Sequence, residues 1–375
     1  MNLKSFRLIG ISGLAVAIGT LVAAAAGSAQ AAAPKGVALC IGLDALDPSH
    51  YGGWSGELWA CEFDANDMRD IAKSQGFDVQ WNAAIPDGVL LTTAATRKAV
   101  LDAMGAAAEQ LVAGDIFMIS YSGHGGQVLD KNGDEKSNGP DDLLDETWCL
   151  YDGEMLDDEL HKAFRGFKAG VRILMFSDSC HSGTVAKDAF YVALVELSRE
   201  RSPLGVNAVF ADGGRFASGD LTSYFTQFDR GADREPASEV RSGVPGFRSM
   251  PLDVAKRTWV QNLEFYEQIG TAEGLVGPEV AMRGEDGDMV ASGLLISGCQ
   301  DNQKSQDGTR NGAFTGALRG VWSSGVPEYT RSYRRFHQAI VAKFEHNPSQ
   351  TPNYYPFGAR NMAFEEQRPF TVATP

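Results

Sequence analysis

The chain has 375 residues, of which 43% are hydrophobic, and it carries a formal net charge of -15. This length and apolar content allow a large core, so the composition excludes a chain that is disordered throughout. The excess of acid argues against nucleic acid as a partner, because such binding depends mainly on Lys and Arg at phosphates. Basic peptides are electrostatically more natural partners.

The first residues have the pattern of a secretory signal. Lys4 and Arg7 precede an apolar run over residues 8–26, and small residues follow it. We predict a signal peptide over residues 1–31 with cleavage near Ala31, which places the mature protein in the periplasm or outside the cell without a membrane span. The alternative is an uncleaved anchor, since the run is nearly long enough to cross a bilayer.

Apolar strands and amphipathic helices alternate along the chain after this leader. Strands are predicted over residues 36–43, 77–81, 116–119, 173–176 and 293–299. Helices are predicted over residues 62–74, 93–113, 157–167, 312–321 and 333–345. The alternation is typical of an α/β fold with a mainly parallel sheet covered on both faces. Residues 350–357 contain two prolines and suit an edge strand.

Residues 187–289 interrupt the alternation with turn-rich patches. Residues 191–197 and 252–268 are each compatible with a helix, so we expect an insertion with some structure of its own. We also expect the insertion to be cut during maturation, because it contains basic residues that look exposed. Examples are Arg199, Arg201, Arg241 and Arg257.

Two of the predicted strands run directly into segments with small residues and reactive groups. The strand at 116–119 leads to His124 in a glycine-rich turn, and the strand at 173–176 leads to Cys180. Because the carboxyl ends of parallel strands open onto one crevice, these side chains can meet as base and nucleophile. A thiol with an ordinary pKa is mostly protonated at neutral pH, so a catalytic cysteine needs such a base. His181 is expected to point away from the site and to be structural.

These segments resemble the catalytic motifs of metacaspases, the caspase-like cysteine peptidases of bacteria, plants, fungi and protozoa. The resemblance rests on residues 121–125 and 178–183 and on two later blocks at 296–303 and 312–318. It spans residues 36–358, apart from 187–289. It implies a caspase-like three-layer αβα fold whose mainly parallel central sheet has about six or more strands.

The resemblance also implies how the chain is divided. Residues 36–186 would form the large-subunit-like catalytic core, 187–289 the insertion, 290–360 a small-subunit-like part of the same domain, and 361–375 a tail. Metacaspases are more often monomers than the caspases, which are dimers, so the resemblance implies a monomer.

The resemblance implies a cysteine endopeptidase. Cys180 would attack a peptide carbonyl and His124 would protonate the leaving amine. The amides of Gly125 and Cys180 would hold the oxyanion. No organic cofactor is expected. The alternatives are a catalytically inactive caspase-like module that binds partners, and a metal-dependent hydrolase that uses the acidic cluster described below.

Asp178 indicates which substrates the site prefers. It precedes Cys180 by two positions, so in an extended segment both side chains lie on the same face. A carboxylate there favours Arg or Lys in a protein or peptide substrate. Metacaspases also cut after Arg or Lys, and the resemblance implies an acidic pocket, termed S1 here, formed by Cys61, Asp64, Ser122 and Asp178. Phe63 replaces the asparagine that is usual before the aspartate, and Asp64 could instead be a helix N-terminal acid favoured by the dipole.

Residues 130–159 contain twelve acids and two lysines. Such a cluster is usually a solvated loop, yet closely spaced carboxylates also suit calcium. Residues 130–135 do not fit an EF-hand, because its sixth position requires glycine and holds Glu135. The resemblance implies stimulation by calcium at Asp145, Asp157 and Asp158, with Asp188 as a further ligand.

The chain has five cysteines, an odd number that does not suit a disulfide framework. At least one should therefore be a free thiol. Cys40 and Cys299 lie in strand-like runs and are expected to be buried apolar residues.

Overall fold

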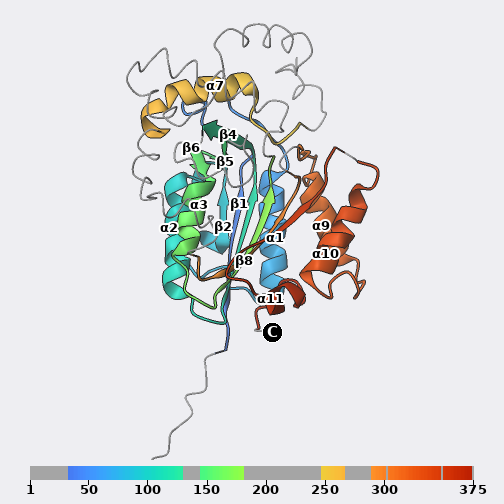
Figure 1. Cartoon of the computed structure of the whole chain (residues 1–375). Coiled ribbons are helices and arrows are strands. Elements are labelled where there is room, and N and C mark those ends of the chain that lie inside the picture. The colour runs from blue at the N-terminus through green and yellow to red at the C-terminus, as the bar shows by residue number, and fades with distance from the viewer. Residues whose placement is uncertain are drawn as a thin grey trace, which may run out of the picture. The chain divides into compact units, whose positions relative to one another are not determined.

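A six-stranded sheet forms the centre of the unit that begins at Pro34 (Figure 1). The computed structural model describes residues 33–129, 144–180, 246–266, 289–300, 303–347 and 349–373. The strand order is β2-β1-β3-β7-β8-β9, and every neighbouring pair is parallel except β8 and β9, which are antiparallel. The predicted α/β fold with a mainly parallel sheet is confirmed.

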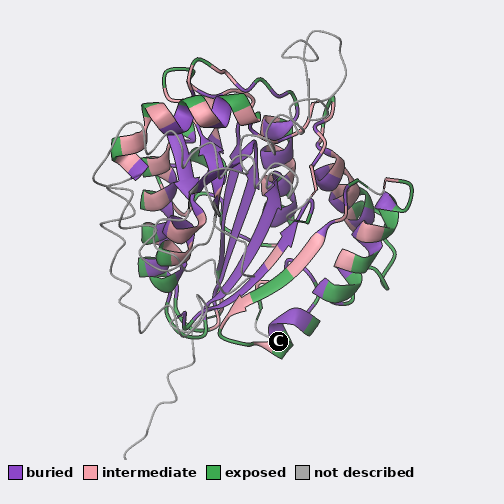
Figure 2. Ribbon diagram, turned by 45° about the horizontal axis from the view of Figure 1, so that its top comes forward, coloured by how far each residue is buried: buried purple, intermediate pink, exposed green. Residues whose placement is uncertain are grey.

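The central strands β1 (Gly36–Gly42), β3 (Ile116–Ser122) and β7 (Arg172–Asp178) are buried along their whole length (Figure 2). β8 (Ser292–Ser297) follows them, and β2 (Val89–Leu91) and β9 (Asn353–Gly358) form the two edges of the sheet. Continuous apolar runs suit the central positions because helices cover both faces of a parallel sheet. The late strand and the edge strand lie where they were predicted, to within a few residues.

Helices cover both faces of this sheet (Figure 1). α2 (Arg97–Gln110) and α3 (Asp157–Arg165) belong to one hydrophobic cluster. α1 (Cys61–Ser74), α9 (Ala313–Ser323), α10 (Tyr333–Val341) and α11 (Met362–Glu366) belong to the other. Alternate residues of β1 enter different clusters, with Leu39 in the first and Cys40 in the second, as a period of two requires. The fold therefore has three layers.

A smaller antiparallel sheet lies beyond the end of β3. It consists of β4 (Gly125–Leu129), β5 (Leu144–Leu150) and β6 (Gly153–Leu156). α7 (Leu252–Gln261) lies over β4 (Figure 1) and buries Val254 and Trp259 in the first cluster. The sequence did not predict this sheet. Short 3₁₀ turns occur at Pro86–Gly88, Thr92–Ala94 and Ala342–Phe344.

The strand predicted over residues 77–81 is wrong. Only one bridge, between Asp78 and Val37, joins this segment to β1. The carboxylate of Asp78 accepts a hydrogen bond from the amide of Gln80 at 2.7 Å, which bends the chain at this point. Phe77 and Val79 are buried, which explains the apolar pattern. β2 occupies the edge beside β1 instead.

Several predicted helices differ in their bounds from the expectation. α2 begins only at Arg97, because the hydroxyl of Thr96 accepts the amide of Ala99 at 3.2 Å and caps the helix there. The helix predicted over 252–268 is interrupted at Asn262: α7 ends at Gln261, residues 263–266 are helical again, and residues 267–268 lie outside the described residues. The helix predicted over 191–197 lies outside the described residues.

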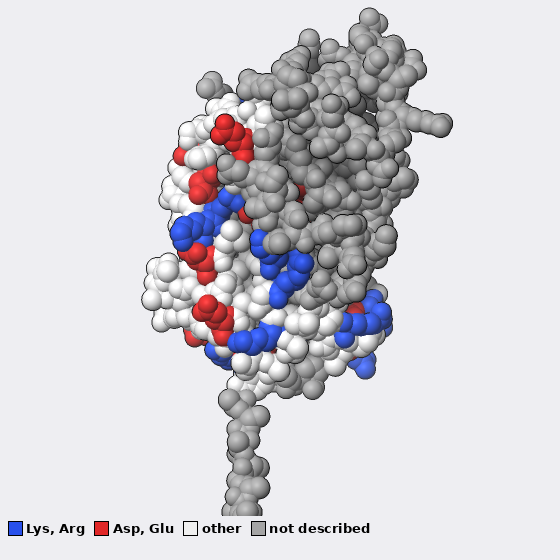
Figure 3. All heavy atoms as spheres, turned by 60° about the vertical axis from the view of Figure 1, so that its left-hand side comes forward, with Lys and Arg blue, Asp and Glu red and all other residues white. Residues whose placement is uncertain are grey.

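All five cysteines are buried and free, so the prediction of a free thiol is confirmed. None of the described helices is long and apolar enough to span a membrane. On the face seen in Figure 3, the acidic and basic side chains of the described residues are interspersed.

Candidate active site

The two predicted catalytic residues lie at neighbouring strand ends. β3 and β7 pair in register up to Ser122 and Asp178, and the amide of Gly123 donates to the carbonyl of Asp178 at 3.4 Å. The chain after each strand therefore emerges at the same edge of the sheet. A Cβ atom on Gly125 would lie 1.9 Å from the carbonyl oxygen of Cys180, so only glycine permits this approach.

His124 is buried and held in one orientation. Its ring packs on Trp54 with 4.6 Å between centroids, and its Nε2 lies 3.1 Å from the carbonyl oxygen of Gly56. A carbonyl only accepts, so Nε2 carries the proton and Nδ1 keeps its lone pair in the neutral ring. Nδ1 makes no hydrogen bond within the described part of the chain.

The surroundings of His124 favour its neutral form. Burial is the main cause that lowers its pKa to about 3, and the charge of Arg248 lowers it further. The hydrogen bond to the carbonyl of Gly56 and the nearby main chain of Ser249 oppose this shift. At neutral pH the ring is therefore unprotonated, as a general base requires.

Cys180 follows β7 and is fully buried. Its Sγ accepts the amide of Ser305 at 2.6 Å and lies 3.2 Å from the carbonyl oxygen of the same residue. Burial raises the pKa of the thiol, and the neighbouring Cys299 raises it further, whereas the main chain of Ser305 and Arg248 lowers it. In this state the sulfur is a thiol, and it needs a base to become nucleophilic.

Residues 246–250 cross the ends of the two strands as an extended segment. The carbonyl oxygen of Arg248 accepts the amide of Gly125 at 3.0 Å and the amide of Cys180 at 3.1 Å. The amide of Arg248 donates to Ser305, and the amide of Met250 donates to the carbonyl of Gly125. One carbonyl of the chain thus lies between the two amides that were predicted to hold an oxyanion.

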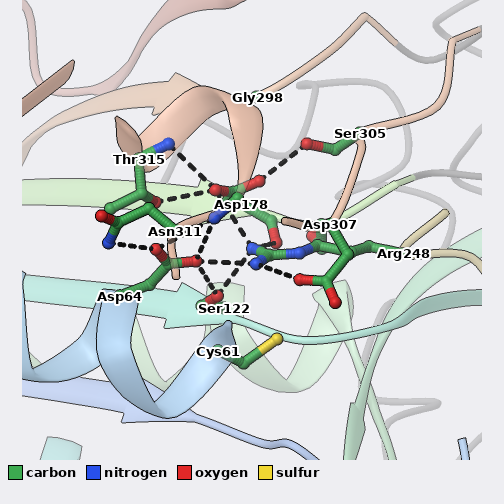
Figure 4. Close-up of polar contacts among 12 residues, drawn as sticks. Cys61, Asp64, Ser122, Asp178, Arg248, Gly298, Ser305, Asp307, Asn311 and Thr315 are labelled. Atoms are coloured by element: carbon green, nitrogen blue, oxygen red, sulfur yellow. Dashed lines mark hydrogen bonds and ion pairs between the residues drawn. The ribbon is translucent and has the colours of Figure 1, made fainter. Parts of the chain in front are cut away.

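The side chain of Arg248 is completely buried among the predicted pocket residues (Figure 4). Its Nη1 donates to the hydroxyl of Ser122 at 2.7 Å and to the carbonyl of Asp178 at 3.0 Å, and it lies 3.1 Å from Oδ2 of Asp178. Its Nη2 donates to Asp64 at 2.7 Å and to Asp307 at 2.9 Å. Three carboxylates therefore surround one guanidinium, and its main partners include three of the four residues predicted to form the pocket.

The start of α9 holds Asp178 in place. Oδ2 accepts the amide of Thr315 at 3.0 Å and its hydroxyl at 2.7 Å, and Oδ1 accepts the hydroxyl of Ser305 at 2.7 Å. A carboxylate at a helix N-terminus is favoured by the unpaired amides and by the helix dipole. The register of β7 and the position of α9 therefore fix this carboxylate together.

Asp64 lies on α1 and is held from the same side. It accepts the side-chain amide of Asn311 at 2.9 Å and the backbone amide of Gly312 at 3.2 Å. Burial is the largest cause that raises its pKa to about 6; Arg248 lowers the value and Asp178 raises it. The alternative interpretation of Asp64, as a simple helix N-terminal acid, does not account for these contacts.

Cys61, the fourth predicted pocket residue, is the first residue of α1 and is fully buried. Burial raises the pKa of its thiol, and the charge of Arg248 is the next largest influence and lowers it. Figure 4 shows it beside Ser122. Phe63 is 51% exposed, so the residue that departs from the metacaspase pattern does not line the buried pocket.

Sequence reasoning missed several residues of this site. Arg248 lies in the segment that no motif covered, and Ser305 and Asp307 lie in the connection between β8 and α9, between two recognised blocks. The position of that connection was the only available signal, because it follows the carboxyl end of a parallel strand.

The predicted calcium ligands are only partly described. Asp145 is buried in β5, and Asp157 and Asp158 begin α3, where the amide of Asp158 donates to the carboxylate of Asp157. Asp188 lies outside the described residues. Within the described ranges, no three or more His, Cys, Asp or Glu side chains gather in a way that could hold a metal ion. The calcium site therefore stays a prediction, because one of its four expected ligands lies outside the described residues.

Comparison with known proteins agrees with the geometry. The family model of the caspase domain, peptidase family C14, matches residues 35–362. Metacaspase-1 of Schizosaccharomyces pombe is 27% identical over 330 residues, covering 84% of this chain and 66% of that protein. Metacaspase-1 of Scheffersomyces stipitis is 26% identical over 278 residues, covering 73% and 59% respectively. The chain thus spans about three fifths to two thirds of the length of these two relatives.

A solved structure is also similar. The crystal structure of a structural-genomics target from Geobacter sulfurreducens is 46% identical, with a TM-score of 0.65, and the match covers 90% of this chain and 99% of that one. The resemblance to metacaspases drawn from the motifs is confirmed. The chain belongs to the caspase-domain family of cysteine peptidases and is metacaspase-like.

Proposed function

We propose that this protein is a cysteine endopeptidase that cleaves peptide bonds after Arg or Lys, with Cys180 as nucleophile and His124 as base. One observation carries the proposal. The chain's own Arg248 has its guanidinium among three carboxylates and its carbonyl oxygen on the amides of Gly125 and Cys180. A substrate with a basic residue before the cleaved bond would use the same contacts.

The proposed reaction uses these residues in turn. Sγ of Cys180 attacks the carbonyl carbon, and the thiol proton passes to Nδ1 of His124. The two amides hold the negative oxygen that forms, since they already donate to the carbonyl oxygen in this state. The carbon–nitrogen bond then breaks, the amine takes the proton from His124, and water hydrolyses the remaining thioester. The carbonyl of Gly56 accepts the proton on Nε2 of His124, which leaves Nδ1 available to take the thiol proton.

We also propose that the protein cuts itself between Arg248 and Ser249. Main-chain atoms of Ser249 lie close enough to His124 to raise its pKa, so the residue that would follow the cut lies beside the proposed base. Of the earlier candidates, Arg199, Arg201 and Arg241 lie outside the described residues. Arg257 lies inside α7, where its side chain pairs with Asp253, and a helical peptide bond cannot extend across the strand ends.

Reporter peptides and the full-length chain test both proposals. Wild-type protein should cleave peptides with Arg or Lys before the cut but not those with Asp, and its own new N-terminus should be Ser249 by mass spectrometry. Cys180→Ala should abolish both cleavages, and Arg248→Ala should remove the cut after residue 248. Arg257→Ala is the matched control and should leave that cut intact. An active protein that stays at full length would contradict the self-cleavage, and Arg cleavage by Cys180→Ala would contradict the mechanism.

Calcium stimulation remains part of the proposal, with Asp145, Asp157, Asp158 and Asp188 as the ligands that the resemblance implies. It is tested by measuring reporter cleavage after chelation and after calcium is added back. Activity that survives thiol alkylation but not chelation would instead favour the metal-dependent hydrolase. A binding module without activity would cleave no reporter under either condition.

We propose further that residues 1–31 direct the protein to the periplasm or the cell exterior and that the mature protein is a monomer. N-terminal sequencing of protein recovered from each cell fraction, and its mass in solution, test these two points.

A further inference from the structure

Asp307 is a third carboxylate in the pocket, and it comes from a part of the chain that no recognised motif covers. It lies between β8 and α9 and is only 6% exposed. Its Oδ1 accepts Nη2 of Arg248 at 2.9 Å, and its Oδ2 accepts the amide of Trp59 at 2.9 Å. Its own amide donates to the carbonyl of Gly246 at 2.8 Å. The contact with Trp59 is independent of residues 246–250, so it can hold this carboxylate when a substrate takes the place of Arg248.

The pocket contacts the guanidinium from two directions (Figure 4). One outer nitrogen of the guanidinium, Nη1, contacts Ser122 and Asp178. The other end, Nη2, lies between Asp64 and Asp307. Nε makes no hydrogen bond within the described residues. The contacts are thus made at the two outer nitrogens of a planar group, the part of arginine that lysine lacks.

A lysine side chain in the same place would end too early for these contacts. It has four carbons and then the ammonium nitrogen, so the nitrogen would lie near the position of the central carbon of the guanidinium, one bond short of both Nη atoms. A single ammonium there cannot make direct hydrogen bonds to Asp307 on one side and to Ser122 and Asp178 on the other. Water would have to complete the gaps, or one acid would be left without a direct partner.

We infer that Asp307 is a specificity-determining residue that makes this pocket prefer Arg over Lys. The inference rests on the proposed function, since it concerns the same pocket, but it makes a separate claim. The loss of a hydrogen bond between charged groups typically lowers binding roughly tenfold to a hundredfold. The wild-type protein should therefore cleave an Arg peptide with a kcat/KM at least about tenfold higher than that for the matched Lys peptide.

Asp307→Asn tests the inference directly. It keeps the shape of the side chain and one oxygen acceptor but removes the charge. The kcat/KM for the Arg peptide should fall about tenfold, with a smaller loss for the Lys peptide, so that the Arg to Lys ratio decreases. Asp70→Asn, an exposed acid on α1 paired with Arg69, is the matched control and should leave the ratio unchanged. An unchanged ratio in Asp307→Asn would overturn the inference.

A second measurement does not depend on that variant folding. Arg248→Lys replaces the basic residue at the proposed self-cleavage site, and the rate at which the full-length chain cuts after residue 248 should fall by about tenfold or more. Equal self-cleavage rates, or equal kcat/KM for the two peptides in the wild type, would refute the preference while leaving cleavage after basic residues intact. If the wild type cleaves neither peptide, the proposed function itself fails.

Discussion

Removal of the Arg248 side chain should release the segment whose carbonyl accepts the amide of Cys180. Arg248 is the only cation among the hydrogen-bond partners described for Asp64, Asp178 and Asp307, and all three acids are buried. Breaking a buried ion network by removing one partner typically costs about 3–5 kcal/mol, because the remaining charges lose their compensation. The lower end applies here, since Asp64 has a pKa of about 6 even with Arg248 present and can take up a proton.

The expected signal is faster alkylation of Cys180. The thiol is fully buried, and the amide of Cys180 donates to the carbonyl of Arg248, so we expect a reagent to reach the thiol more readily when residues 246–250 leave the site. Each 1.4 kcal/mol changes the open fraction tenfold, so about 3 kcal/mol corresponds to a rise in labelling rate of roughly a hundredfold. The comparison is best made between His124→Ala and the double variant His124→Ala with Arg248→Ala. Neither can cut itself by the proposed mechanism, and both retain the thiol.

Mass spectrometry resolves the labelling by residue. Cys40, buried in β1, serves as the internal reference for global unfolding. Arg257→Ala is the matched control, because the Arg257–Asp253 pair is largely exposed and such pairs contribute about 0–1 kcal/mol. If Cys180 is labelled at rates within about twofold of each other in His124→Ala and in the double variant, Arg248 does not hold residues 246–250 in place and the reasoning is refuted.

Further predictions concern pH and the oxyanion amides. The KM for an Arg peptide should rise as the pH falls through about 6. Asp64 has a raised pKa of about 6, so it becomes neutral there and loses its charge pairing with the guanidinium of the substrate. A KM that stays flat between about pH 5 and 8 would contradict this role. Gly125→Ala should lower kcat by about a hundredfold or more, since the new Cβ would lie 1.9 Å from the carbonyl oxygen of Cys180 and displace an amide that we propose holds the oxyanion. Gly105→Ala on α2, where nothing lies within 4 Å of the new Cβ, is its control and should keep full activity; equal activity of the two variants would argue against the oxyanion role.

The sequence by itself predicted the parts of the fold that depend on local pattern. Buried strands and amphipathic helices alternate in the residues, and the α/β sheet follows because each strand must be covered on both faces. The ends of two strands carried His124 and Cys180, and the parallel arrangement implied their proximity. Where local pattern was ambiguous, the prediction was wrong: residues 77–81 are apolar enough for a strand, but Asp78 bends the chain and β2 takes the edge.

Only the tertiary structure decided what occupies the pocket. Arg248 lies seventy residues after Asp178 in a segment without a motif, and its contacts depend on how residues 246–250 cross the sheet. Asp307 reaches the same guanidinium from a third part of the chain. The sequence could specify the chemistry of each side chain, because that chemistry belongs to the residue. It could not specify which of these side chains come into contact, because hydrogen bonds between distant segments depend on three-dimensional packing and leave no periodic signal in the sequence.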